Sequence, residues 1–130
     1  MATTDTWTAD QLDRVGNSTE LDLASRRADG SLTGYTTMWV VRVGDELYVR
    51  SAGGPDRPWY RHARTNGTGR IRAGGVDAEV TFDLHAEPAP HDSIDAEYHR
   101  KYDRYGPGPV GHVTGPESHP VTVHLVRSEP

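Results

Sequence analysis

Two-residue turns that contain glycine join short runs of β-branched and aromatic residues at two places in the sequence. The first pair of runs occupies residues 36–51, with Gly44-Asp45 between them. The second pair occupies residues 70–84, on either side of Gly74-Gly75. Runs of this kind around a two-residue turn are typical of β-hairpins. We therefore predict two hairpins, and antiparallel neighbours must make up most of the sheet.

Helical patterns and two further strands complete the predicted chain. Thr8 and Gln11 have the spacing of a capping box at the start of a first helix. Asp56 is suited to N-cap a short second helix, with Pro58 tolerated in its first turn. The whole pattern predicts an α+β fold, a small barrel of mostly antiparallel strands with two or three helices. The other predicted elements are the second helix at residues 57–65, a third at 94–105, strands at 20–25 and 121–126, and a Gly- and Pro-rich loop at 107–120.

The composition limits the classes of protein that the chain can represent. A length of 130 residues, 34% of them apolar, fits a single domain over residues 1–130 with one modest core. No apolar run approaches the roughly 20 residues that cross a membrane, and the first residues do not resemble a secretory signal. The absence of cysteine and the net charge of −5 favour a cytoplasmic protein that does not bind nucleic acid or membranes.

Six arginines against one acidic residue, between residues 50 and 72, form the strongest functional signal in this acidic chain. If the second helix packs on the strand that follows it, five of these guanidinium groups converge on one cavity. Guanidinium binds phosphate or carboxylate through two parallel hydrogen bonds, so such a cavity would hold a small anionic molecule. The alternative is a solvated face whose arginines pair with acids elsewhere. The five residues are Arg57, Arg61 and Arg64 on the helix, and Arg70 and Arg72 on the strand.

Aromatic residues and one histidine are further candidates. Trp59 would either shape a pocket for a planar or aromatic molecule or pack in the core. Tyr60 is a candidate proton donor if its environment tunes a pKa that is ordinarily near 10. His112 is a candidate acid or base, because loops over the mouth of a barrel often carry function. The three tyrosines of the third predicted helix are expected in the core or at a dimer interface: Tyr98, Tyr102 and Tyr105.

A metal site is not expected. The chain has seven histidines, but none lies at a recognised ligand spacing from another histidine or a carboxylate. They are His62, His85, His91, His99, His112, His119 and His124.

Several stretches taken together resemble the bacterial domain-of-unknown-function 2255 family. They are SRRADG at residues 25–30, WVVRV at 39–43, GPD at 54–56, WYR at 59–61, GRIRAGG at 69–75, VTF at 80–82 and YHRKY at 98–102. That family is similar to the flavin-binding split β-barrels, particularly the deazaflavin-dependent nitroreductase branch. The resemblance implies a split β-barrel, a homodimer and a ligand site at the subunit interface.

The resemblance also implies which residues would bind a cofactor. The polar loop from Arg27 to Gly30, the Gly53-Gly54 turn and Trp59-Tyr60 occupy the corresponding places of the nitroreductase branch, in which this helix lies beside the cofactor. From the residues themselves, we expect the helix arginines Arg57, Arg61 and Arg64 to anchor a phosphate or carboxylate. The chain departs from the branch at residues 31–35, which contain no basic residue where a phosphate would be held.

Two functions therefore remain open. One is an oxidoreductase that depends on FMN or a deazaflavin. The other, favoured by the departure at residues 31–35, binds no cofactor and is a biosynthetic enzyme or ligand-binding protein that uses the same pocket. A purely structural dimer is a third possibility.

Overall fold

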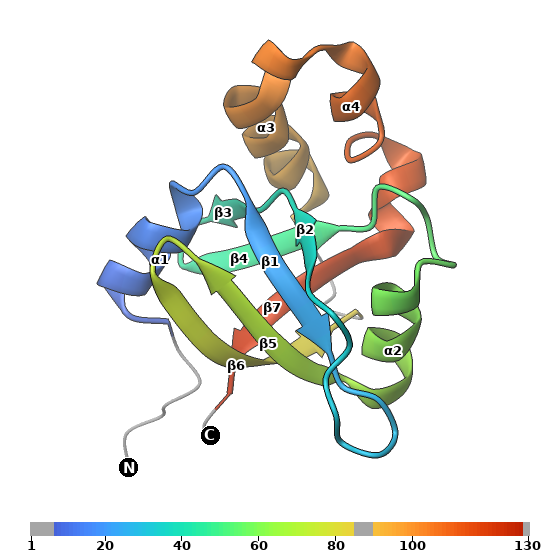
Figure 1. Ribbon diagram of the computed structural model, residues 1–130. Helices are drawn as coiled ribbons and strands as arrows, with labels where there is room; N and C mark the ends of the chain where they lie inside the picture. The colour runs from blue at the N-terminus through green and yellow to red at the C-terminus, as the bar shows by residue number, and fades with distance from the viewer. Residues whose placement is uncertain (1–6, 85–89, 129–130) are drawn as a thin grey trace.

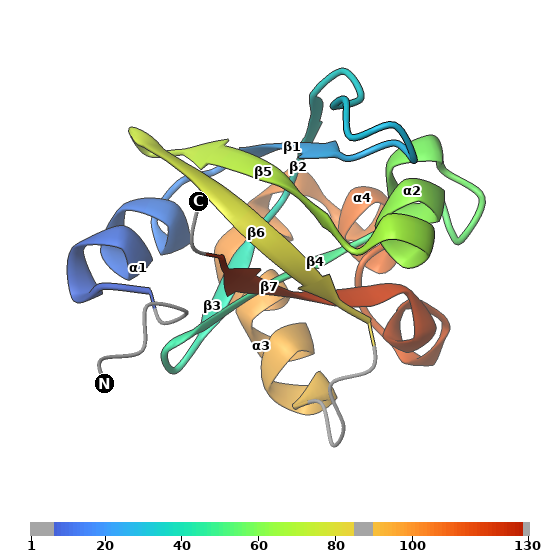
Figure 2. The same cartoon turned by 90° about the horizontal axis from the view of Figure 1, so that it is seen from below.

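The computed structural model describes residues 7–84 and 90–128 (Figure 1). Within them, seven antiparallel strands form one sheet in the order β2-β1-β5-β6-β7-β4-β3. The sheet curls into a half-barrel (Figure 2), and the predicted α+β split-barrel fold is confirmed. The strands are β1 (Leu21–Ser25), β2 (Thr36–Met38), β3 (Val41–Val43), β4 (Glu46–Arg50), β5 (Thr68–Ala73), β6 (Val76–Asp83) and β7 (Thr122–Arg127).

Both predicted hairpins are confirmed, with the expected two-residue turns. Val43 pairs with Glu46 across the first turn, and Ala73 pairs with Val76 across the second. β5 also approaches β1 closely at Gly69. A Cβ there would lie 2.1 Å from the carbonyl oxygen of Ala24, so only glycine fits at this point of the sheet.

The run at residues 36–43 was expected to form one strand and instead forms two. β2 pairs with β1, whereas β3 pairs with β4. The break falls at Val40, whose backbone groups are bonded by side chains of a helix. Its N–H donates to the Tyr102 hydroxyl at 3.2 Å, and its carbonyl accepts from Lys101 Nζ at 2.6 Å. These bonds replace the ladder bonds that a continuous strand would make.

The helices follow the predicted order, with two corrections. The capping box of Thr8 and Gln11 is confirmed, since both of its hydrogen bonds form. The expected N-cap at Asp56 is wrong: Arg57 is the N-cap residue and makes no side-chain cap bond. Residues 107–120, expected to be a loop, contain short helices that begin at prolines, which are tolerated in a first turn. The helices are α1 (Ala9–Gly16), α2 (Pro58–Asn66), α3 (His91–Tyr102) and α4 (Pro107–Gly111), with 3-10 turns η1 (Asp103–Tyr105) and η2 (Pro116–Val121).

The apolar side chains form two clusters. The larger cluster fills the half-barrel and includes Trp59. The smaller lies between α3 and the hairpin of β3 and β4, where Tyr98 and Tyr102 are fully buried. Tyr105 is 46% exposed, so the predicted tyrosine stripe is divided between core and surface.

Candidate functional site

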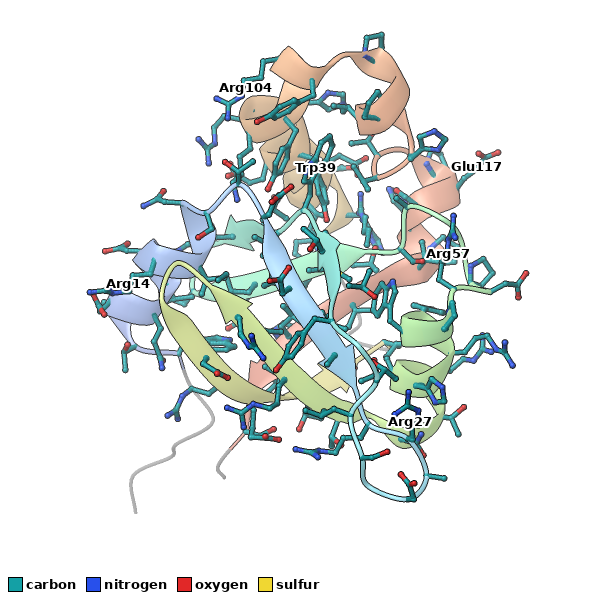
Figure 3. All side chains as sticks on the ribbon, viewed as in Figure 1. Arg14, Arg27, Trp39, Arg57, Arg104 and Glu117 are labelled. Carbon is teal, nitrogen blue, oxygen red and sulfur yellow. The ribbon has the colours of Figure 1, made fainter. Side chains whose placement is uncertain are left out.

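A cleft of about 670 Å³ opens between β2, the end of β4, the start of α2 and the α4 segment. Its volume lies within the range of roughly 300–1,000 Å³ typical of small-molecule sites. Figure 3 shows Trp39 above β2 and Arg57 at the start of α2, and both residues line this cleft. The lining residues are Glu20, Thr36, Thr37, Met38, Trp39, Arg50, Ala52, Gly53, Arg57, Trp59, Gly108, Pro109, His112 and Val113.

Trp39 is held in place by aromatic neighbours. Its ring stacks on Tyr102 with ring centres 4.2 Å apart and an angle of 7° between the planes. Tyr105 also contacts it, with ring centres 5.6 Å apart. The Tyr102 hydroxyl is itself anchored, because it donates to the carbonyl oxygen of Thr19 at 2.7 Å. Trp39 therefore presents a positioned aromatic surface to the cleft.

Arg57 brings an uncompensated positive charge to the cleft. Its side chain makes no hydrogen bond or ion pair with any residue in the described part of the chain, and the residue is exposed. The guanidinium group lies against Gly53, where a Cβ would come within 1.7 Å of Nε. Glycine at position 53 thus leaves the space that the arginine occupies.

Arg50 is a buried residue of the cleft lining, and its guanidinium group is hydrogen-bonded to other residues of the protein. Its Nε donates to Thr122 Oγ1 at 2.8 Å, and its Nη1 donates to the carbonyl of Val113 at 2.9 Å and to the carboxylate of Asp95. Its Nη2 lies 3.2 Å from His91 Nδ1. The buried guanidinium therefore ties β4 to α3 and to the segment that forms one wall of the cleft.

Asp95 neutralises Arg50. Burial would raise the pKa of this carboxyl group, but the hydrogen bond and charge of Arg50 outweigh burial and lower the pKa below its usual value. The second carboxylate oxygen accepts from the Gly115 N–H at 3.3 Å and lies 3.4 Å from His119 Nε2. The His119 ring in turn stacks on His91 at 4.2 Å. Arg50 is thus balanced internally and differs from Arg57 in this respect.

Four of the residues predicted as site residues line the cleft: Gly53, Arg57, Trp59 and His112. Gly54 follows Gly53 but is not in the lining. Arg27 lies far from Trp39 in Figure 3, and its guanidinium donates to the carbonyl of Leu32 at 2.7 Å. Whether the residues outside the lining bind a ligand stays a prediction.

Three residues of α2 predicted as site residues also lie outside the lining. Arg61 is exposed, and Arg64 lies over the Tyr60 ring, with its Cζ 5.8 Å from the ring centre. The Tyr60 hydroxyl donates to the carbonyl of Pro120 at 3.2 Å. Burial raises the pKa of Tyr60, and the nearby Arg64 only partly offsets this effect. The shift is opposite to the one that would ease proton transfer from this hydroxyl near neutral pH.

The expected convergence of five arginines on one cavity is wrong. Arg70 and Arg72 pair with acids of the neighbouring strand, because the hairpin register places Glu79 and Asp77 opposite them. Arg72 also lies over the Tyr35 ring at 3.9 Å. Of the five, only Arg57 lines the cleft.

Trp39, Arg50 and Glu20 line the cleft but were not singled out as site residues. Trp39 lies within the run at residues 36–43 that was predicted as a strand, and nothing in that run distinguishes it as a site residue. Arg50 offers a weak signal, because it is a charged residue at the end of the apolar run of β4. Glu20 precedes β1 among many other acids and has no distinguishing motif.

The described residues contain neither a cluster of metal-ligating side chains nor a helix that could cross a membrane. Within residues 7–84 and 90–128, no group of three or more His, Cys, Asp or Glu side chains is arranged to hold a metal ion. His85 lies outside these ranges. In the same part of the chain, no helix has the length and apolar character needed to cross a membrane.

Comparison with known proteins gives a family and a fold. A family described as "Uncharacterized protein conserved in bacteria (DUF2255)" matches residues 11–125. No curated protein matches the chain. An F420 reductase has a similar structure, with a TM-score of 0.53 and 22% identity over 89% of this chain and 90% of that one.

Two further solved structures share the fold. A conserved hypothetical protein from Mycobacterium tuberculosis has a TM-score of 0.59 and 17% identity over 99% of this chain and 84% of that one. A putative pyridoxamine 5'-phosphate oxidase from Listeria innocua has a TM-score of 0.59 and 16% identity, covering 90% of this chain and 88% of that one. At these identities the similarity establishes the split-barrel fold.

Proposed function

We propose that this chain, which belongs to the DUF2255 family of uncharacterized proteins conserved in bacteria, binds a planar, anionic small molecule of the flavin or deazaflavin class in the cleft. The function that we infer is that of an oxidoreductase. The relation to the F420 reductase, which its name ties to a cofactor of this kind, supports the proposal at the level of the fold.

The unpaired guanidinium of Arg57 is the observation that carries the proposal. An arginine beside an aromatic cleft, with no acid bonded to it in the described part of the chain, is free to form two parallel hydrogen bonds with a phosphate or carboxylate. A ligand that binds there exchanges water around the guanidinium for a charge-assisted bond. Arg57 would therefore fix the anionic end of the ligand.

The aromatic lining supports a planar ligand. Trp39 is already stacked on one ring, and Trp59 is a second indole in the lining. Offset stacking against such surfaces is favourable for flat heterocycles. A bound flavin or deazaflavin would supply hydride-transfer chemistry, and these residues would set its orientation and exclude water from one side.

His112 is the residue that we propose for proton transfer. It lies in the lining and is exposed, so a bound molecule can reach its imidazole. Tyr60 is the weaker candidate, since its hydroxyl is bonded to a backbone carbonyl outside the lining. The role of the histidine is to donate or accept a proton at the edge of the ligand.

A cofactor-free ligand-binding function is the second candidate, and one observation favours it. Among the residues described, Arg57 is the one lining arginine that is not already bonded within the protein, and residues 31–35 add no basic residue. A single free guanidinium suffices for a carboxylate, whereas a phosphate that carries about two charges is usually held by more donors. A biosynthetic substrate with one carboxylate would suit this cleft.

We also propose that the protein is a cytoplasmic homodimer. The dimer is supported by the family resemblance together with Tyr105, which is exposed and whose ring contacts Trp39. Tyrosine is enriched at interfaces, because it brings apolar area with a polar tip. Sedimentation equilibrium would give twice the monomer mass, and a monomer at all concentrations would reject the dimer.

Fractionation of cells that produce the protein would test the proposed cytoplasmic location.

The absorption spectrum of the purified protein distinguishes the two candidate functions. We expect either a bound chromophore or saturable binding when the colourless protein is titrated with FMN and with a deazaflavin, followed by tryptophan fluorescence. Binding of neither compound would reject the cofactor-dependent oxidoreductase and leave the cofactor-free candidate.

A further inference from the structure

A second unpaired charge, of opposite sign, lines the same cleft. Glu20 is exposed, and its carboxylate makes no hydrogen bond or ion pair with another residue in the described ranges. Glu20 also lines a second hollow together with Arg72, but that arginine pairs with Asp77 and forms no ion pair with Glu20. The carboxylate is thus left to solvent or to a ligand.

Tyr102, which supports Trp39, also holds the backbone immediately before Glu20. The Tyr102 hydroxyl donates to the carbonyl of the preceding residue, Thr19, at 2.7 Å, and the Tyr102 ring stacks on Trp39. Burial is the main cause that raises the pKa of Tyr102 to about 12, and the negative charge of Glu20 adds to it. The backbone that leads into Glu20 is therefore held by the Tyr102 side chain that stacks on Trp39.

The two unpaired charges line the cleft from separate segments of the chain. Glu20 immediately precedes β1, and Arg57 immediately precedes α2. In Figures 1 and 2 the start of β1 and the start of α2 lie on opposite sides of β2, and the two residues form no ion pair with each other. The lining thus holds an unpaired negative charge and an unpaired positive charge on separate segments, together with the indole of Trp39.

We propose that this cleft selects dipolar ligands: molecules whose anionic group binds Arg57 and whose cationic nitrogen, or strongly polarised N–H donor, binds Glu20. The inference rests on the proposed ligand site and specifies the class of molecule that it takes. A nitrogen-bearing aromatic carboxylate or phosphate meets both requirements.

Repulsion makes Glu20 a specificity-determining residue as well as a binding one. A ligand that is anionic at both ends would bring like charges together in a partly desolvated cleft, which is unfavourable. A ligand that is anionic at one end and apolar at the other would leave the carboxylate desolvated without a partner. Both classes are therefore disfavoured relative to a dipolar molecule of the same shape.

Two benzoates of nearly equal shape test the proposal. 4-Methylbenzoate carries only the anionic group, whereas 4-(aminomethyl)benzoate carries an ammonium group in addition. We expect the second to bind the wild-type protein about tenfold more tightly, as a charge-assisted hydrogen bond allows. Tryptophan fluorescence and calorimetry would both report binding, since two indoles line the cleft.

Variants assign the preference to the residue. Glu20→Gln should reduce the ratio of the two affinities to about one, because the amide keeps the size of the side chain and removes its charge. Glu117→Gln, which neutralises an exposed carboxylate outside the lining, should leave the ratio unchanged. Arg57→Gln should weaken both benzoates by the same factor.

The outcomes separate this inference from the proposed function. Equal binding of the two benzoates to the wild-type protein, or a preference that survives Glu20→Gln, overturns the dipolar selection while Arg57-dependent binding stands. Failure of both benzoates to bind, or binding that Arg57→Gln does not change, rejects the ligand site and the inference with it.

Discussion

At the scale of single residues, the absence of a side chain at Gly53 leaves room for the Arg57 guanidinium group in the cleft. A methyl group at this position would occupy the place of the Arg57 Nε atom, and the backbone of Gly53 has no positive φ that would strain an alanine. Gly53→Ala should therefore displace the guanidinium and weaken FMN binding about tenfold. The free energy of unfolding should change by less than about 1 kcal/mol.

Gly111→Ala is the matched control, because no atom lies within 4 Å of a Cβ built there and the residue is outside the lining. It should leave affinity unchanged. Equal affinity of the wild-type protein and Gly53→Ala, measured by fluorescence titration, would show that the contact between Gly53 and Arg57 does not matter for binding.

The buried amine of Lys101 makes the free energy of unfolding depend on pH in the alkaline range. The pKa of its amine is lowered to about 8, mainly by burial and also by the charge of Arg100, with a smaller opposing effect of Glu97. The unfolded chain holds this proton up to a pKa near 10.4. Between these two values the unfolded state binds more protons, so the contribution of Lys101 to stability rises with pH.

The comparison that isolates this effect uses Lys101→Met. From pH 7.5 to 9.5, the wild-type protein should gain about 1 kcal/mol of unfolding free energy relative to the variant, after allowance for the partial exposure of the amine. Urea unfolding at both pH values would measure this. A difference between the two proteins that stays constant with pH would mean that the amine titrates normally.

At the scale of elements, the ion pair of Arg50 and Asp95 fixes α3 and the segment after α4 to the end of β4. Asp95→Asn would leave the guanidinium buried without a counter-charge, which should cost about 3–5 kcal/mol of unfolding free energy. Asp92→Asn changes an exposed acid of the same helix and should cost little. Chemical denaturation at neutral pH would compare them, and similar values for both would refute the role of the ion pair.

The same pair gives an acid-sensitive contribution. Because the folded-state pKa of Asp95 is lowered, its stabilisation is complete above the unfolded-state value and is lost as the pH falls through the folded-state value. The contribution should therefore begin to fall below about pH 4 and be lost once the pH is below the lowered folded-state pKa, and Asp95→Asn should lack this dependence.

Local patterns predicted the elements well where the interaction partners are close in sequence. The hairpins followed from their turns, and the capping box of α1 followed from Thr8 and Gln11. The pairing of Arg70 and Arg72 with Glu79 and Asp77 was also available from the register of a two-residue turn, although we expected these arginines in the cavity. The division of the run at residues 36–43 was not available, because it depends on Tyr102 and Lys101 far along the chain.

At the scale of the whole molecule, the cleft is made by segments that only the fold brings together. Glu20, Trp39, Arg57 and His112 come from four separate parts of the chain. Their types and local spacing identify Arg57 and His112 as candidates, but no local pattern indicates that Glu20 shares their cavity. The fold class was predictable from turns and periodicity, whereas the charge distribution of the cleft required the three-dimensional arrangement.

Titration of the Arg57→Gln variant with FMN tests the central claim most directly. Arg14→Gln is the control, since Arg14 lies on α1 on the opposite side of the molecule from Arg57 in Figure 3. We predict that the dissociation constant rises at least about tenfold for Arg57→Gln and is unchanged for Arg14→Gln, because one charge-assisted interaction with the ligand is lost. Equal affinity of wild-type protein and Arg57→Gln would contradict an anion site in this cleft.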